Sequence, residues 1–350
     1  MRTSKRVILS CLVFILLFVL LSAAVQIPWR NSEYSYYLDH RVREDLAGKI
    51  DFIVVGASHG LTAFEPRTLD EELGSVSYNL CGSQMPIYNR SYMLRKEMDR
   101  NPVKTVVLEI AYDALFRQQT SDHEDGDSIT LLRLHSPAEE FKYLTTYVSA
   151  DDWLNIYCRH MNSALQYWKD MLFGEETNHI DHSAKGYHKR ASIDITIPDE
   201  QIVTMYGQSE KMEPFREDNV SQFYELIETC KQAGCRVVVV STPLSNKMVW
   251  EAKDLDLFKD RIDEICENAD VPYYNFDLLK GKDQILNDAV SYSDDVHMSY
   301  DGAIAFSRAF CDCMKEIDAG ADLEELFYSD YAEAKEHSPY MDYYRAHTEN

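Results

Sequence analysis

Five short apolar runs, separated by stretches with helical periodicity, constrain the fold more than any other feature of this sequence. Each run is rich in β-branched or aromatic residues and is bounded by turn residues, as expected for buried strands. Alternation of such strands with helices is typical of a parallel sheet with crossover helices. The predicted strands are residues 51–55, 76–80, 105–110, 236–241 and 272–276. We therefore predict an α/β fold built on a parallel sheet.

Three helices are predicted in the second half of the chain from apolar residues at helical spacing. The first begins near Asn219 and ends at Gly234, where the freedom of glycine at positive φ suits a helix C-terminus. The second follows Asp254, and the last begins near Asp301 and closes the domain.

About a hundred residues separate the third strand from the helix at Asn219, far more than an ordinary α/β connection requires. We interpret residues 114–215, approximately, as an insertion. Its first half, about 137–174, carries many aromatic residues at spacings that predict two amphipathic helices. We expect these aromatic side chains to pack in a core; a lid over the site is the alternative.

An uncharged apolar run at residues 7–27 is about as long as a membrane-spanning helix requires. Arg2, Lys5 and Arg6 precede it, which by the positive-inside bias places the N-terminus in the cytoplasm and the remaining chain outside. We predict a single-pass anchor. A cleavable signal peptide is the alternative, because Ala23 and Ala24 supply small residues.

The predicted organisation is a cytoplasmic tail (1–6), a transmembrane anchor (7–27), a juxtamembrane linker (28–48), an α/β domain (49–320) and an acidic tail (321–350). A formal net charge of −24 argues against nucleic-acid partners, which require clustered basic residues. Eight cysteines show no disulfide framework or zinc spacing, and Cys230, Cys266 and Cys311 are expected as buried thiols. No cofactor or metal is expected.

The first strand ends in Gly56-Ala57-Ser58-His59-Gly60, which places a hydroxyl at a strand-to-helix turn on the carboxyl edge of the sheet. The glycines allow a tight turn, and the first amides of the next helix point toward developing negative charge. Ser58 is therefore a candidate nucleophile. A structural turn or a phosphate-binding loop is the alternative.

A candidate base lies just before the last helix, in the segment Ser293-Asp294-Asp295-Val296-His297. An Asp three residues before a His can accept the Nδ1 hydrogen of the imidazole and leave Nε2 to take a serine proton. Asp294 has this spacing to His297. The alternative is an ordinary helix-entry loop with acids near the helix N-terminus.

Together these segments resemble blocks I, II and V of SGNH/GDSL-type hydrolases, over about residues 50–317 without the insertion. The matching positions are Ser58, Gly82 in NLCGSQ after the second strand, and Asp294 with His297. The resemblance implies a three-layer, flavodoxin-like sheet, with Ser58 as nucleophile, His297 as base and Asp294 as its orienting acid. It also implies that the backbone amides of Ser58 and Gly82 contribute to an oxyanion hole.

The sequence departs from this family after the third strand, where Glu-Ile-Ala-Tyr-Asp at 109–113 stands in place of Gly-x-Asn-Asp. Glu109, Tyr112 and Asp113 are candidates for substrate contact there, and His59 is a candidate oxyanion donor or substrate contact. The α/β-hydrolase fold also uses G-x-S-x-G, but its serine follows several strands and its acid and histidine usually lie on separate loops. His179, His182 and His188 lack the spacing of a zinc site.

The chain looks most similar to the membrane-anchored branch that includes the D-alanyl teichoic acid transfer and alginate O-acetylation proteins. This implies an extracytoplasmic serine esterase or O-acyltransferase that acts on acyl esters of a cell-envelope polymer, beside a membrane-bound O-acyltransferase. The alternative is a catalytically silent scaffold or glycan-binding partner of such an enzyme. The missing asparagine favours that alternative.

Overall fold

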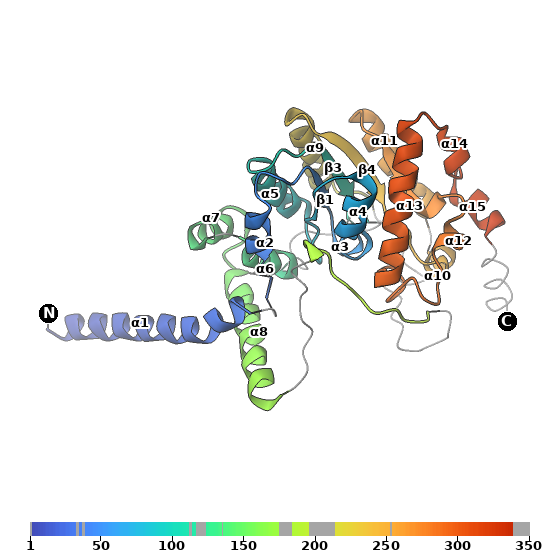
Figure 1. Cartoon of the computed structure of the whole chain (residues 1–350). Helices are drawn as coiled ribbons and strands as arrows, with labels where there is room; N and C mark the ends of the chain where they lie inside the picture. Colours follow the sequence, from blue (N-terminus) through green and yellow to red (C-terminus); the bar gives the residue numbers. More distant parts are fainter. Residues whose placement is uncertain are drawn as a thin grey trace. The chain divides into compact units, whose positions relative to one another are not determined.

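The computed structural model describes residues 2–32, 35–36, 39–111, 114–116, 124–134, 136–174, 184–195, 214–252 and 254–338. The chain divides into two compact units (Figure 1). Unit 1 comprises residues 1–44 and 127–182, and unit 2 comprises residues 45–126 and 183–350.

Unit 2 contains a parallel sheet of five strands in the order β2-β1-β3-β4-β5. This is the flavodoxin-like order, in which the crossover direction reverses between β1 and β3. All five predicted strands are present, with one or two residues fewer at the ends of four of them. Their bounds are β1 Phe52–Val55, β2 Ser77–Asn79, β3 Thr105–Glu109, β4 Arg236–Ser241 and β5 Tyr273–Asn275.

Helices cover both faces of this sheet, which confirms the predicted three-layer α/β architecture (Figure 1). On one face, α13 (Tyr300–Asp318) packs against α3 (Ser58–Ala63) and α4 (Pro66–Leu73). On the other face, α5 (Ile87–Met98) packs against α9 (Glu217–Gln232), and α11 (Leu255–Asn268) contacts β5. The three helices predicted in the second half of the chain are therefore α9, α11 and α13.

Shorter elements connect these layers. After β4 comes α10 (Asn246–Glu251), and after β5 come the 3-10 helix η3 (Phe276–Leu278) and α12 (Lys282–Ile285). Beyond α13, the acidic segment forms α14 (Leu323–Leu326) and α15 (Tyr331–His337).

Aromatic side chains fill the core between α13 and the sheet. The rings of Phe64, Phe276, Phe306 and Phe310 are fully buried, and their centroids lie 5.2–6.4 Å apart in tilted or edge-to-face pairs. Such pairs add to the free energy gained by burying the rings themselves. The core thereby fixes α13, and with it the loop that precedes this helix.

The segment of residues 184–195, which we call the strap, is the longest described stretch of the predicted insertion within unit 2. It runs over the carboxyl ends of β2 and α3. The backbone amide of Asn79 donates a hydrogen bond to the carbonyl of Lys185, and the amide of His188 donates one to the carbonyl of Leu61. Further along, Ile193 donates to the carbonyl of Tyr292 at 2.9 Å. The strap therefore joins α3 to the loop before α13.

Unit 1 is helical. It holds α1 (Arg2–Arg30), most of α2 (Asp39–Asp45) and of α6 (Glu124–Leu132), α7 (Pro137–Tyr147) and α8 (Trp153–Phe173). The two amphipathic helices predicted within 137–174 correspond to α7 and α8. Apolar contacts join Trp29, Leu132 and Ala164, and a buried ion pair of 3.2 Å joins Arg133 to Asp39.

The expectation that the aromatic residues of α7 and α8 pack in a core is correct for only part of them. Tyr143 is fully buried and donates to Asp127 at 2.6 Å. Four others have exposed side chains, so for them the expectation is wrong: Phe141, Tyr147, Trp153 and Trp168. Helical spacing alone does not distinguish a side chain that faces a core from one that is exposed.

Helix α1 contains the predicted apolar run and is long and apolar enough either to cross a membrane or to serve as a signal sequence. An 18-residue window of this helix has a mean hydropathy of 3.0, and none of that window is buried within the protein. The predicted span is therefore a single continuous helix, with Pro28 in its last turn.

Candidate active site

The turn after β1 places Ser58 at the first residue of α3, on the carboxyl edge of the sheet. The reason for its two glycines is the neighbouring side chain of Glu109 at the end of β3. A Cβ atom on Gly56 would lie 2.2 Å from Oε2 of Glu109, and one on Gly60 would lie 2.7 Å from the sulfur of Cys81. Close packing therefore requires glycine on both sides of Ser58.

Glu109 is fully buried, and its Oε2 accepts a hydrogen bond of 2.7 Å from the amide of Ala57, the residue before Ser58. Its backbone carbonyl accepts from Arg90 at 3.0 Å. Burying a carboxylate is costly unless it is hydrogen-bonded, so its position is tightly determined. Glu109 thus holds the backbone of the turn in place through its hydrogen bond with the amide of Ala57. The sequence signal for this role is a lone acid in an otherwise apolar strand.

On the opposite side of the edge, the loop before α13 pairs Asp294 with His297. Both carboxylate oxygens of Asp294 contact Nδ1 of the imidazole, at 2.9 and 2.8 Å, and Oδ1 also accepts the amides of Val296 and His297. Burial acts to raise the pKa of Asp294, but these contacts outweigh it and lower the pKa to about 2. Asp294 is therefore an ionised partner that fixes the imidazole orientation.

Arg190 of the strap forms an ion pair of 3.0 Å with Oδ2 of Asp294. The sequence gives no signal for this contact, because Arg190 lies in the insertion and more than a hundred residues separate the two. The strap is held here by the amide of Tyr300, which donates to the carbonyl of Arg190 at 2.9 Å. Arg190 therefore connects the insertion to the Asp294–His297 pair.

The two halves of the site meet through His59 and His297, whose rings lie edge to face with centroids 5.3 Å apart. Both side chains are buried, whereas Ser58 is half-buried. Within the part of the chain that the structure describes, Nε2 of His297 is buried and has no hydrogen-bond partner. No hydrogen bond joins Ser58 to His297 among these described residues. A histidine nitrogen is thus available next to the turn that carries Ser58.

No contact with His297 is seen for the other predicted site residues that the structure describes. The amide of Gly82, assigned to an oxyanion hole by the resemblance, donates to the carbonyl of Gly56 at 3.3 Å. Tyr112 and Asp113 lie outside the described residues. Asn79, at the end of β2, donates to the carbonyls of Gly60 and Phe64 at 2.9 Å and so stabilises α3.

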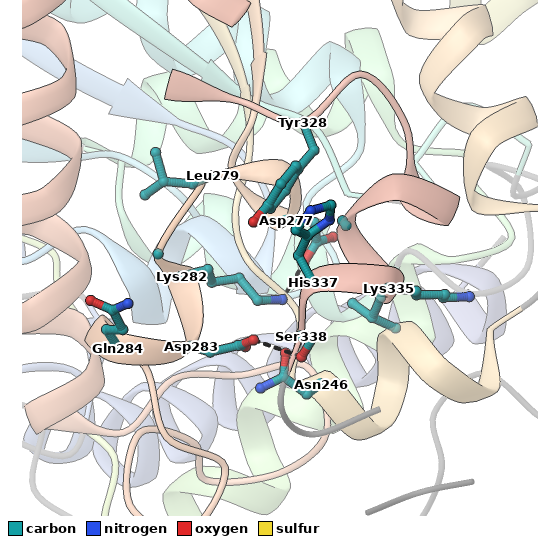
Figure 2. Close-up of a pocket in the computed structure, with 13 residues that line it drawn as sticks. Asn246, Asp277, Leu279, Lys282, Asp283, Gln284, Tyr328, Lys335, His337 and Ser338 are labelled. Atoms are coloured by element: carbon teal, nitrogen blue, oxygen red, sulfur yellow. Dashed lines mark hydrogen bonds and ion pairs between the residues drawn. The ribbon is translucent and has the colours of Figure 1, made fainter. Parts of the chain in front are cut away.

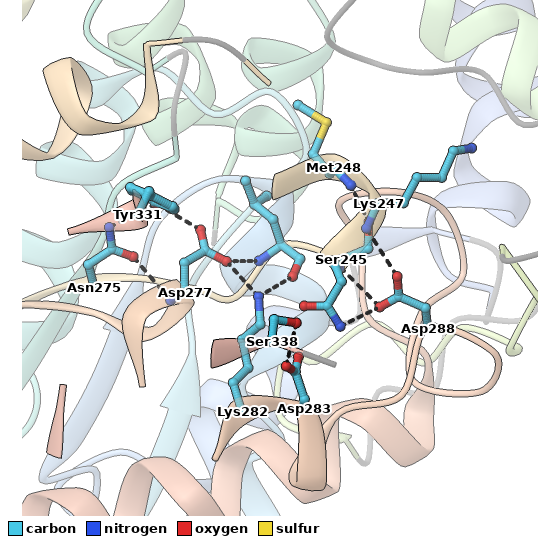
Figure 3. A network of polar contacts seen from close by, with 12 residues as sticks. Ser245, Lys247, Met248, Asn275, Asp277, Lys282, Asp283, Asp288, Tyr331 and Ser338 are labelled. Carbon is cyan, nitrogen blue, oxygen red and sulfur yellow. Dashed lines mark hydrogen bonds and ion pairs between the residues drawn. The ribbon is translucent and has the colours of Figure 1, made fainter. Parts of the chain in front are cut away.

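A buried polar network surrounds Asp277 and Lys282 (Figure 3) and reaches the loop that carries His297 through Tyr292. Asp277, after β5, accepts the amide of Leu244 at 2.7 Å and pairs with Lys282 at 3.3 Å. The carbonyl of Leu244 accepts both from Lys282 and from the hydroxyl of Tyr292, which is close to His297 in sequence. Burial raises the pKa of the Asp277 carboxyl despite the nearby Lys282. The network fixes the loops after β4 and β5 against the histidine loop.

Beside this network lies a small pocket of about 160 Å³, lined by Asp277, Lys282, Asp283, Lys335 and His337 among others (Figure 2). Ser58, Asp294 and His297 do not line it. Two pairs of its polar side chains contact each other: Ser338 with Asp283 at 2.6 Å and Lys282 with Asp277 at 3.3 Å. The pocket is therefore separate from the candidate active site.

The structure tests the predicted burial of three cysteines, but it describes only part of the segment with the three histidines. Cys230, Cys266 and Cys311 are buried and free, as predicted, and burial raises the pKa of each thiol to about 12. His179 and His182 lie outside the described residues. In the described part of the chain, no group of three or more acidic, histidine or cysteine side chains is arranged to hold a metal ion.

Fold and site together define an α/β protein of flavodoxin-like topology, with an Asp–His pair beside a serine-bearing turn at the carboxyl edge of its sheet. No protein-family model and no curated protein matches the sequence.

Solved structures that resemble the chain include a GDSL-like lipase from Bacteroides thetaiotaomicron, with TM-score 0.39, 10% identity, and coverage of 82% of this chain and 100% of the other. A lipase/acylhydrolase from Enterococcus faecalis has TM-score 0.33, 11% identity, and coverage of 76% and 96%. A variant of an acetyl-xylooligosaccharide esterase from Geobacillus has TM-score 0.35, 10% identity, and coverage of 79% and 97%. With TM-scores this low, the comparison does not transfer the activities of these proteins to this chain.

Proposed function

We propose that this chain is a serine esterase or O-acyltransferase of the SGNH/GDSL type. The observation that carries the proposal is the pair of contacts at 2.8 and 2.9 Å between Asp294 and Nδ1 of His297, which leaves Nε2 buried and unpartnered among the described residues. The ring of His297 lies against His59, directly after Ser58. A base oriented by an ionised acid and a nearby hydroxyl are the parts that nucleophilic acyl transfer requires.

In the proposed reaction, Oγ of Ser58 attacks the carbonyl carbon of an acyl ester while Nε2 of His297 takes the hydroxyl proton. The tetrahedral intermediate collapses as His297 returns this proton to the leaving alcohol, and the acyl group remains on Ser58. Water or a sugar hydroxyl then attacks the acyl carbon while His297 takes its proton; the bond to Oγ breaks, and His297 returns the proton to Ser58. The Ser58–His297 hydrogen bond that this requires commonly tightens only when substrate binds.

Glu109 and Arg190 are positioning residues in this scheme. Glu109 fixes the amide of Ala57 and so the backbone that carries Ser58, and Arg190 restrains the acid that orients His297. Neither is proposed to contact the reacting atoms.

The proposed setting is the outer face of a membrane, with α1 as the anchor and a cell-envelope polymer as donor or acceptor of the acyl group. The support is the single apolar helix at the N-terminus, preceded by basic residues, together with the resemblance of the motifs. A membrane-bound O-acyltransferase is the partner proposed for this setting.

A fluorophosphonate probe, which reacts with activated serine hydroxyls, tests the proposal. Wild-type protein should be labelled, and Ser58→Ala should abolish labelling. The matched control is Ser221→Ala, which removes an exposed serine on α9 and should leave labelling unchanged. Persistent labelling of the Ser58 variant would contradict the assignment.

A second candidate function, a catalytically silent scaffold, is favoured by one observation: the Gly82 amide is already hydrogen-bonded to Gly56. Folded wild-type protein that resists the probe would support it. In cells that carry Ser58→Ala, normal acylation of the polymer would support the scaffold function. Loss of acylation in these cells would support the enzyme.

A further inference from the structure

Helix α8 of unit 1 has an exposed apolar stripe along its length. Leu154, Leu165 and Leu172 are spaced by 11 and 7 residues, close to whole numbers of helical turns, and are 67%, 51% and 71% exposed. Intervening positions on the same stripe are also apolar and at least partly exposed: Cys158, Met161 and Trp168. Soluble proteins rarely leave an apolar surface of this length uncovered.

The other sides of α8 differ in character. Ile156 and Ala164 face the interior of unit 1, and the flank about 100° around the helix from the stripe is polar: Asn155, Arg159, Asn162, Gln166 and Lys169. The helix is therefore amphipathic on its outer surface, with basic rather than acidic groups on its polar side.

Charge also sets α8 apart from the rest of this acidic protein. The chain has 59 acidic residues, yet Asp170 is the only one in α8, and it is buried and accepts from Gln166 at 2.6 Å. Arg159 and Lys169 lie on the polar side. An anionic lipid surface would repel most of the protein but not this helix.

Helix α8 packs directly on α1. The indole of Trp168 donates to the carbonyl of Val25 at 3.0 Å, and the hydroxyls of Tyr157 and Ser22 are 2.6 Å apart. Within unit 1, α8 crosses the C-terminal half of α1 rather than running alongside it (Figure 1). The apolar stripe of α8 is thus continuous with the uncovered apolar surface of α1.

We propose that α8 is a second membrane contact, which lies in the plane of the bilayer with its apolar stripe in the lipid interface. A helix that crosses a membrane-spanning helix near its outer end lies along the membrane surface, and interfacial helices insert their apolar side only shallowly. The contacts with Ser22 and Val25, near the outer end of α1, place α8 at that depth. This inference rests on α1 as an anchor and is independent of the activity of Ser58.

The natural thiol of Cys158 lies on the stripe and, with Cys11, is one of two exposed cysteines in the described chain. The experiment uses the full chain with Cys11→Ser, reconstituted in phosphatidylcholine vesicles that contain phosphatidylglycerol, with a nitroxide on Cys158. The matched control moves the label to the polar side of the same helix, in Cys11→Ser, Cys158→Ser, Asn162→Cys.

Relaxation of the label by oxygen, which partitions into lipid, is compared with relaxation by a water-soluble nickel complex. We expect oxygen to dominate at position 158 and nickel at position 162. Equal nickel access at both positions would overturn the proposal. Protection of position 158 from both reagents would overturn it in favour of a protein contact; dipolar broadening that grows with protein density would identify a second copy. Loss of fluorophosphonate labelling in Ser58→Ala would not alter these outcomes.

Discussion

At the scale of single residues, the proposed mechanism depends on Asp294 and His297. We expect Asp294→Asn to lower kcat/KM for an aryl acetate about 10²- to 10⁴-fold, because the neutral amide no longer stabilises the imidazolium. The matched control is Asp301→Asn, an exposed acid in the first turn of α13, which should leave the rate unchanged. A near wild-type rate in the Asp294 variant would contradict the proposed role.

The low pKa of Asp294, about 2 against an ordinary value of 3.8, also predicts an effect on stability. The folded state stabilises the ionised carboxylate of Asp294 relative to the unfolded state. The resulting contribution to the free energy of unfolding is present above about pH 4 and is lost as the pH falls toward 2. Urea unfolding measured at steps between pH 5 and pH 2 should therefore show a shallower loss of stability in Asp294→Asn than in wild type. Parallel pH profiles would argue against the Asp294–His297 contact.

Gly56 and Glu109 should be energetically coupled. Gly56→Ala forces a Cβ atom to within 2.2 Å of Oε2 and 2.6 Å of Cβ of Glu109, and Glu109→Gly removes both obstacles while it leaves the Ala57 amide without its acceptor. We expect each single change to destabilise the protein and the double change to cost less than their sum, by about 0.5–3 kcal/mol. Denaturant unfolding of the four proteins measures this coupling. Additive losses would contradict the packing described for the turn.

Residues with a local motif could be predicted from the sequence, and residues without one could not. The contact of Asp294 with His297 and the placement of Ser58 at a strand-to-helix turn followed from residue types and spacing within a few positions; their catalytic roles stay predictions. The support from Glu109 depends on the pairing of β1 with β3, and that from Arg190 depends on the path of the insertion. Neither leaves a periodic signal, because long-range packing determines both.

At the scale of elements, the strap depends on one glycine. Gly186 has φ +84°, and a Cβ atom there would lie 1.9 Å from the carbonyl oxygen of Asn79. Gly186→Ala should therefore displace the strap and reduce both activity and the free energy of unfolding, the latter by more than about 1 kcal/mol. The control is Gly320→Ala, which has φ +92° but open space around its Cβ, so that only the backbone strain is added. Equal effects in both variants, measured by unfolding and esterase assays, would rule out this role.

The sheet was predictable because its strands are buried on both faces and so appear as continuous apolar runs. The ends of four strands were overestimated by a residue or two. In the insertion, helical spacing predicted α7 and α8 but not the exposure of Phe141 or Trp168. The sequence pattern indicates that one face of a helix is apolar, but it does not indicate which part of the protein, if any, packs against that face.

At the scale of the whole molecule, thiol reactivity tests the burial of cysteines within each unit. Cys11 and Cys158 are exposed, whereas the other six cysteines are buried and free. A short pulse of maleimide on native protein in detergent should leave these six thiols unmodified, whereas all eight should react after unfolding. Mass spectrometry gives the count. Rapid modification of Cys230 or Cys266 would contradict the buried positions assigned to them.

The fate of α1 distinguishes an anchor from a signal peptide. With an epitope tag placed before Arg2, an anchored protein keeps the tag and stays in the membrane pellet after alkaline carbonate extraction. Cleavage near Ala23 and Ala24 would release an untagged protein into the soluble fraction. We expect the tagged form in the pellet, because α1 is uncharged over its apolar stretch and packs against α8 through Ser22 and Val25.

The most direct test of the central claim is identification of the acylated residue. Protein mixed with a reactive aryl ester, quenched in acid during turnover and digested should yield an acylated peptide that contains Ser58, and His297→Ala should suppress its formation. Turnover with the acyl group on another residue, or with no acylated peptide trapped under conditions in which deacylation limits the rate, would contradict the account.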